Sequence, residues 1–130
     1  MWKLLTLAKD RLQKLQQFRV SRVEFVTEQL GDAETELKEK LIKIFQSNRR
    51  VLCAYLLRVR YPDADQDRVA LCLKHSTGQD LALVRQVEAE FGKMFNHRET
   101  LDIMFLTREQ EERIAITAKP FYRTLREEAQ

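Results

Sequence analysis

The segment 50–61 constrains the fold more than any other part of the chain, because it is apolar on both sides of an extended backbone. One side carries Val51, Cys53, Tyr55, Leu57 and Val59, and the other carries Leu52, Ala54, Leu56, Arg58 and Arg60. This pattern is typical of a strand that is buried on both faces at its start and half exposed at its end. A turn-forming run over 62–67 and a second apolar strand over 68–75 follow, so the pattern predicts an antiparallel hairpin.

The segments before and after this hairpin show apolar residues at helical or at strand-like spacing. Apolar residues recur at helical spacing over 34–47 and 79–95, and they alternate over 20–28 and 100–106. The resulting order, strand–helix–strand–strand–helix–strand, is that of the ferredoxin-like βαββαβ motif. We therefore predict an α+β domain with a four-stranded antiparallel sheet and both helices on one face. A short helix over 108–117 and an extended tail complete the domain, and Asp32 is expected to cap the first helix.

The first twenty residues differ from the rest in charge. They carry a net charge of +4, whereas residues 21–130 sum to −1. We predict a basic amphipathic helix over 1–19, one α+β domain over 20–125 and a polar tail over 126–130. The helix stripe, which includes Leu4, Leu12 and Leu15, has three open roles: packing on its own domain, pairing with another chain, or lying on a membrane surface. The near-neutral body argues against a nucleic-acid partner.

The sequence shows no constellation that would carry catalysis. Phosphate-binding glycine loops and the GxSxG nucleophile motif are absent. His75 and His97 stand apart from each other and from any cluster of metal ligands, so we predict no catalytic residue, no metal and no cofactor. No apolar run has the length of a membrane span or a signal peptide, which predicts a cytoplasmic protein.

The two cysteines, Cys53 and Cys72, lie in apolar strand-like runs. We predict that they are buried and serve as small hydrophobic residues. The alternative is a thiol enzyme or sulfur carrier in serine or cysteine metabolism that uses one of them, which would need a thiol of lowered pKa.

Four short stretches occur in an order that resembles a known family. They are Leu30-Gly31 before the helical run 37–41, Val51–Leu56 in a V-x-x-A-Y-L pattern, Val69–Leu73, and the sequence Lys119-Pro120-Phe121-Tyr122. Together, over about Phe25 to Tyr122, they resemble the C-terminal domain of the SseB family, named for enhanced serine sensitivity. The resemblance implies a small bacterial cytoplasmic α+β domain. It brings no catalytic residue, because the family name records a phenotype rather than an activity.

The aromatic tail has two interpretations. Phe121 and Tyr122 either fold back to close the core, or they form a contact surface, since aromatic residues are enriched among binding hot spots. We predict a non-enzymatic interaction or regulatory domain of the SseB type, linked through its family to serine sensitivity, that binds a protein partner or itself. The residues expected to make that contact are Lys119, Pro120, Phe121, Tyr122, Leu4, Leu12 and Leu15. Membrane attachment through the N-terminal helix is a second alternative.

Overall fold

A computed structural model of the protein describes residues 22–95 and 99–124. The predicted N-terminal helix over 1–19, with Leu4, Leu12 and Leu15, lies outside the described residues, as does the predicted tail over 126–130.

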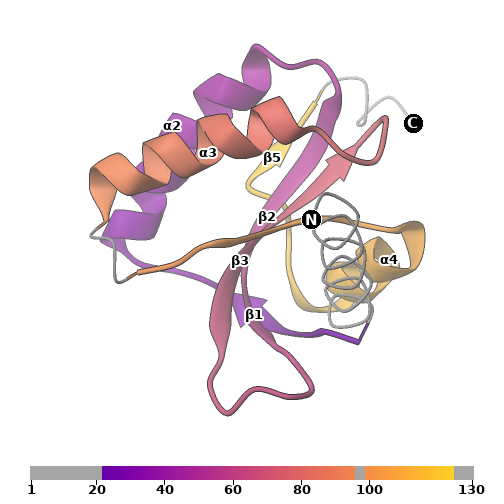
Figure 1. Ribbon diagram of the computed structural model, residues 1–130. Coiled ribbons are helices and arrows are strands. Elements are labelled where there is room, and N and C mark those ends of the chain that lie inside the picture. Colours follow the sequence, from indigo (N-terminus) through magenta and orange to yellow (C-terminus); the bar gives the residue numbers. More distant parts are fainter. Residues whose placement is uncertain (1–21, 96–98, 125–130) are drawn as a thin grey trace, which may run out of the picture.

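The described residues form an α+β domain, as predicted (Figure 1). Each strand and helix expected between residues 20 and 117 is present. The elements in chain order are β1 (Glu24–Glu28), α2 (Asp32–Gln46), β2 (Val51–Arg60), β3 (Arg68–His75), α3 (Leu81–Met94), β4 (Asp102–Phe105), α4 (Arg108–Thr117) and β5 (Tyr122–Arg123).

The long strand β2 is the centre of the sheet, and both of its edges are occupied. β3 pairs antiparallel along one edge, from Val51 to Val59, which confirms the predicted hairpin. The other edge is shared by β1, opposite residues 57–60, and by β5, opposite residues 53–54. The strand order is therefore β1-β2-β3-β4, with β5 added beside β2.

The prediction of an antiparallel, ferredoxin-like sheet is wrong, because β3 and β4 are parallel neighbours. Ala70 lies opposite Asp102 and Leu73 lies opposite Phe105 in this pair. The outer edge of β2 is already taken by β1 and β5, so the chain leaving α3 pairs with the free edge of β3. The connection through α3 returns the chain to the same end of the sheet, so β4 runs parallel to β3, whereas β1 and β2, which are joined through α2, are antiparallel.

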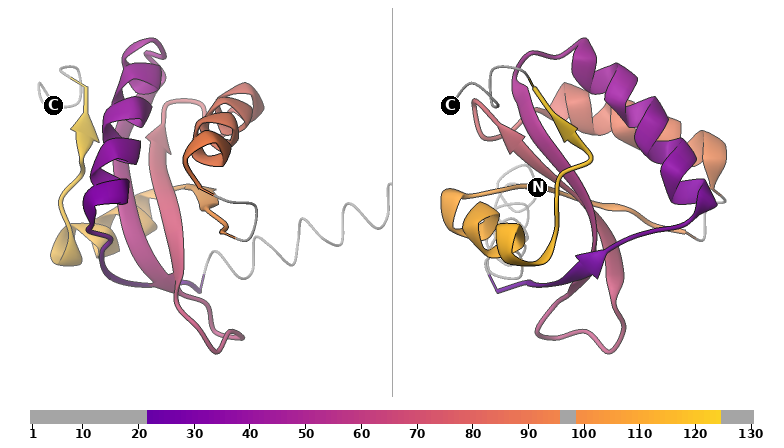
Figure 2. Two further views of the ribbon diagram at one scale, coloured as in Figure 1. Left: turned by 90° about the vertical axis from the view of Figure 1, so that its left-hand side faces the viewer. Right: turned by 180° about the vertical axis from the view of Figure 1, so that it is seen from behind.

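The sheet separates two apolar layers. Helices α2 and α3 lie side by side on one face, as predicted, and α4 lies on the opposite face (Figure 2). The first layer is anchored by Leu41, Phe45 and Leu83 against Leu56 and Leu71. The layer under α4 holds the buried residues Phe25, Cys53, Tyr55, Leu57, Val59, Tyr61, Cys72, Met104 and Ile114.

Candidate functional site

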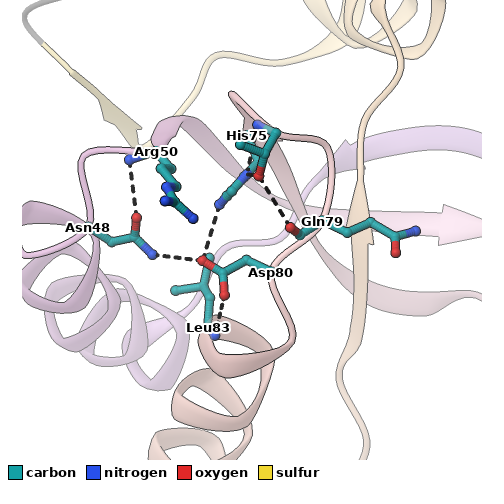
Figure 3. Close-up of polar contacts among 7 residues, drawn as sticks. Asn48, Arg50, His75, Gln79, Asp80 and Leu83 are labelled. Atoms are coloured by element: carbon teal, nitrogen blue, oxygen red, sulfur yellow. Dashed lines mark hydrogen bonds and ion pairs between the residues drawn. The ribbon is translucent and has the colours of Figure 1, made fainter.

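Four elements meet at one end of the sheet and bring three polar side chains together (Figure 3). Asn48 lies between the end of α2 and the start of β2, His75 ends β3, and Asp80 caps α3. Histidine, carboxylate and amide groups in contact are a combination that enzymes use for proton transfer. The geometry of this polar junction (Asn48, His75 and Asp80) decides whether it can do so here.

Both carboxylate oxygens of Asp80 are used inside the fold. Oδ1 accepts the backbone N–H of Leu83 at 3.1 Å, which caps helix α3. Oδ2 accepts the Asn48 amide at 3.1 Å and lies 3.2 Å from His75 Nε2. The hydrogen bonds from Leu83 and Asn48 hold the pKa of Asp80 below its ordinary value. The carboxylate is therefore ionised and fully engaged at neutral pH.

His75 is also engaged at both ring nitrogens. The backbone N–H of Thr77 donates to Nδ1 at 3.2 Å, so the ring proton belongs on Nε2, where it is donated to Asp80. The His75 side chain has no exposed surface, and Phe105 meets its ring edge-on at 5.6 Å between centroids. An imidazole with both nitrogens bonded and no exposed surface has no position for a substrate proton. The polar junction thus ties four elements together rather than forming a catalytic pair.

The two thiols lie on the α4 side of the sheet and are buried, as predicted. Burial raises the pKa of Cys53, and it also raises the pKa of Cys72. A thiol of raised pKa is protonated at neutral pH and is a weak nucleophile. The geometry therefore gives no support to the thiol-enzyme alternative.

A groove of about 620 Å³ opens beside the polar junction, between α2 and α3. We call it the basic groove, and it is lined by Lys40, Lys43, Ile44, Ser47, Asn48, Arg49, Arg50, Gln86 and Glu90. Its one acid, Glu90, is paired with Lys93 at 3.3 Å outside the lining. Four cations therefore face the groove with one neutralised carboxylate.

Three of the groove cations have no charged partner in the described part of the chain: Lys43, Arg49 and Arg50. All three are exposed. Figure 3 shows the Arg50 side chain extending beside the His75–Asp80 pair. The backbone of Arg50 is bonded at both groups: its N–H donates to Asn48 Oδ1 at 3.1 Å and its carbonyl accepts from the Ser76 N–H at 2.8 Å. Unpaired cations around a concave surface attract an anionic ligand.

Sequence reasoning missed the basic groove because it summed the charge of the whole body. The adjacent Arg49 and Arg50, between a predicted helix and a predicted strand, are the signal that was visible. Lys40 and Lys43 lie on the preceding helix at a spacing of three. Only the packing of α2 against α3 turns these four positions into one surface.

The aromatic tail packs against α2. The rings of Phe121 and Tyr122 lie 6.2 Å and 5.4 Å from the ring of Phe45, and the Tyr122 hydroxyl donates to the Phe45 carbonyl at 3.4 Å. The Lys119 N–H donates to Glu28 Oε1 at 2.7 Å, and the Phe121 N–H donates to the Ala54 carbonyl at 2.9 Å.

This packing is the arrangement in which the tail folds back on the core. Pro120, Phe121 and Tyr122 nevertheless remain half-buried, and Lys119 is exposed. The predicted contact role of the tail stays a prediction.

Two further features, a metal site and a membrane-spanning helix, are absent from residues 22–95 and 99–124. No three His, Cys, Asp or Glu side chains gather there in a way that could hold a metal ion. None of the described helices is long and apolar enough to cross a bilayer.

Comparison with known proteins gives one match. The model of the family described as the SseB protein C-terminal domain matches residues 27–124. No curated protein and no solved structure matches the chain.

Proposed function

Since the chain belongs to the SseB protein C-terminal domain family, we propose that it is a non-enzymatic, regulatory binding domain that holds an acidic segment of a partner protein in the basic groove. The family itself supplies no catalytic residue. The groups that could carry chemistry, His75, Asp80 and the two thiols, are buried or bonded within the fold. A binding role is what the remaining surface supports best.

The observation that carries the proposal is the set of three unpaired, exposed cations, Lys43, Arg49 and Arg50, around one groove. In a folded domain, scattered surface cations are ordinary, and isolated surface ion pairs contribute little. Cations gathered on a concave surface add their fields and raise the local concentration of an anionic partner.

The size and surroundings of the groove favour a short acidic protein segment over a nucleic acid. Acidic side chains, Glu36 and Glu39, line the adjoining surface of α2 together with Lys40 and Lys43. Glu36 is paired with Lys40 at 3.8 Å, which leaves Glu39 as the acid that would repel a phosphate backbone extending past the groove. Two or three carboxylates at one point fit the local positive charge without meeting these acids.

The proposal places the domain in the cytoplasm, where it would act on serine sensitivity through its partner. Both cysteines are free and buried, which is compatible with a reducing compartment. We also propose that the tail residues Lys119–Tyr122, which keep exposed surface, form a second contact with the same partner.

The test is titration of a fluorescein-labelled hexaglutamate peptide, followed by fluorescence anisotropy and by amide chemical-shift changes. We expect binding that weakens with added salt, with shifts concentrated at residues 43–50. Shifts at 119–124 would bring the tail into the contact. A K43E/R49E/R50E variant should bind the peptide at least about 10-fold more weakly, which corresponds to about 1.4 kcal/mol.

The matched control is R58E/R85E, compared with R49E/R50E, because the two pairs change the net charge equally and Arg58 and Arg85 are exposed arginines outside the groove. It should bind within about 2-fold of the unchanged protein, since distant surface charges are screened. Equal losses in both variants, or no preference for hexaglutamate over hexaglutamine, would overturn the proposal. Preferential binding of a single-stranded oligonucleotide would assign the groove to nucleic acid instead.

A further inference from the structure

The outer edge of strand β4 is unpaired in the described part of the chain, because β4 is the last strand of the order β1-β2-β3-β4. The N–H of Leu106 donates to the Leu73 carbonyl at 2.8 Å, so Leu106 and Met104 direct their backbone groups toward β3. Backbone groups alternate in direction along a strand. Ile103 and Phe105 therefore present their N–H and C=O groups outward.

At four residues β4 is a short edge strand, but it has no lysine, proline or bulge that would oppose strand addition. The strand reads Asp-Ile-Met-Phe. Its side chains on the α2/α3 face, Ile103 and Phe105, pack against the core but stay half-buried. Leu81, at the start of α3, is 65% exposed. Figure 2 (left) shows β4 at the margin of the sheet, beside β3 and below α3.

We propose that β4 is a self-association surface, where it pairs antiparallel with β4 of a second copy to form a two-fold dimer with one continuous sheet. The strand is self-complementary in that arrangement. With Ile103 opposite Ile103 of the second copy, the outward amides and carbonyls of both copies meet as hydrogen-bonded pairs. Leu101 then lies opposite Phe105, so apolar side chains meet on the α2/α3 face.

The charges at the ends of β4 favour the same partner. Glu99 precedes the strand by three residues and Arg108 follows it by three. Extending the antiparallel register beyond the strand brings Glu99 toward Thr107 and Arg108, the N-cap and first residue of α4, of the second copy. The Arg108 side chain is almost fully exposed and lies 3.6 Å from Glu112 of its own helix, so it can also reach the Glu99 carboxylate of the second copy. The remaining charge, Asp102, is neutralised by Arg68 at 2.7 Å within its own chain.

The experiment is sedimentation velocity of the full chain over a concentration series up to about 100 µM, since the dimer fraction depends on concentration. We expect a dimer for the unchanged protein and a monomer for Ile103→Lys, because a lysine on an edge strand opposes strand addition. Ile116→Lys is the matched control. Ile116 is 87% exposed on α4, away from β4, and this variant should dimerise normally.

A charge exchange keeps the test decisive if Ile103→Lys fails to fold. Glu99→Arg should weaken the dimer at least about 5-fold, which corresponds to about 1 kcal/mol, and adding Arg108→Glu should restore it. A monomeric unchanged protein, or no rescue by the second substitution, would overturn the proposal. The groove variant K43E/R49E/R50E should dimerise like the unchanged protein, so this proposal and the proposed function can fail separately.

Discussion

The polar junction and the basic groove share Asn48, but their polar groups differ in whether they have partners within the fold. In the polar junction, Asp80 accepts from Leu83, Asn48 and His75, so each group has partners inside the fold. In the basic groove, Arg49 and Arg50, which directly follow Asn48, have no charged partner among the described residues.

The difference shows which region can serve an external ligand. A buried polar group must be bonded, because leaving it unsatisfied costs about 1–3 kcal/mol. The polar junction meets that need, because both carboxylate oxygens of Asp80 and both ring nitrogens of His75 are bonded within the fold. An exposed cation is satisfied by water, which a ligand can displace. The residues that look most catalytic are therefore engaged within the fold, and the exposed cations are the groups left for the binding role that we propose.

The largest effect should come from breaking the polar junction. Asp80→Ala removes the cap of α3 and leaves His75 and Asn48 without their shared acceptor, so we expect a loss of about 3 kcal/mol in the free energy of unfolding. Urea denaturation measures it. Glu88→Ala, at an exposed position of the same helix, should change stability little. A loss below about 1 kcal/mol for Asp80→Ala would contradict the role assigned to the junction.

The turn that positions the polar junction should give the next effect. Gly78 has a φ of +90°, and a Cβ there would meet no atom within 4 Å, so the cost of Gly78→Ala is a backbone cost of about 1–2 kcal/mol. Gly92 lies within α3 with equally open space, and Gly92→Ala should stabilise by about 0.5–1 kcal/mol. Thermal unfolding of the two variants should shift in opposite directions. An unchanged or raised unfolding temperature for Gly78→Ala would show that the turn does not require a glycine.

Acid should weaken the polar junction before it affects the basic groove. The lowered pKa of Asp80, caused by its bonds from Leu83 and Asn48, means that its charge stabilises the fold above about pH 4, the ordinary range for Asp. That stabilisation is lost as the pH falls through the folded-state pKa. The stability difference between the unchanged protein and Asp80→Asn should therefore narrow below about pH 4. A constant difference down to the acid limit would exclude Asp80 as the titrating group.

The elements of this fold could be predicted from local pattern, whereas their neighbours in the sheet could not. The alternation of Val51, Cys53 and Tyr55 identifies β2, and the interval 108–117 matches α4. Nothing local distinguishes a parallel β3–β4 pair from a ferredoxin-like order, because that choice depends on which edge of β2 is free. The strand β5 occupies part of one edge of β2, but with two residues it is too short to show an alternation of apolar and polar residues in the sequence.

Local chemistry also misplaced one cap and hid the candidate site. Asp32 was expected to cap α2, but it is the first helical residue and Gly31 holds the cap position, with no side-chain bond. The sequence singles out Phe121 and Tyr122 but leaves two interpretations of them open. Their contacts with the Phe45 ring show that they pack against the core. The basic groove combines helix, turn and strand residues, so a charge sum over the body could not reveal it.

The smallest change in the free energy of unfolding should come from substitutions in the basic groove. A small change there would separate the groove from the polar junction, whose substitution should destabilise the fold strongly. K43E/R49E/R50E removes three cations that have no ion-pair partner among the described residues. The loss of Lys43 from the last turn of α2, together with a carboxylate at position 50 beside Asp80, should lower the free energy of unfolding by no more than about 1 kcal/mol. Relief of repulsion between neighbouring cations would move it slightly upward at low salt. Urea denaturation at low and at high salt measures the change in the free energy of unfolding and its salt-dependent part. A loss as large as that of Asp80→Ala would mean that the groove cations serve the fold, and the contrast between the two regions would disappear.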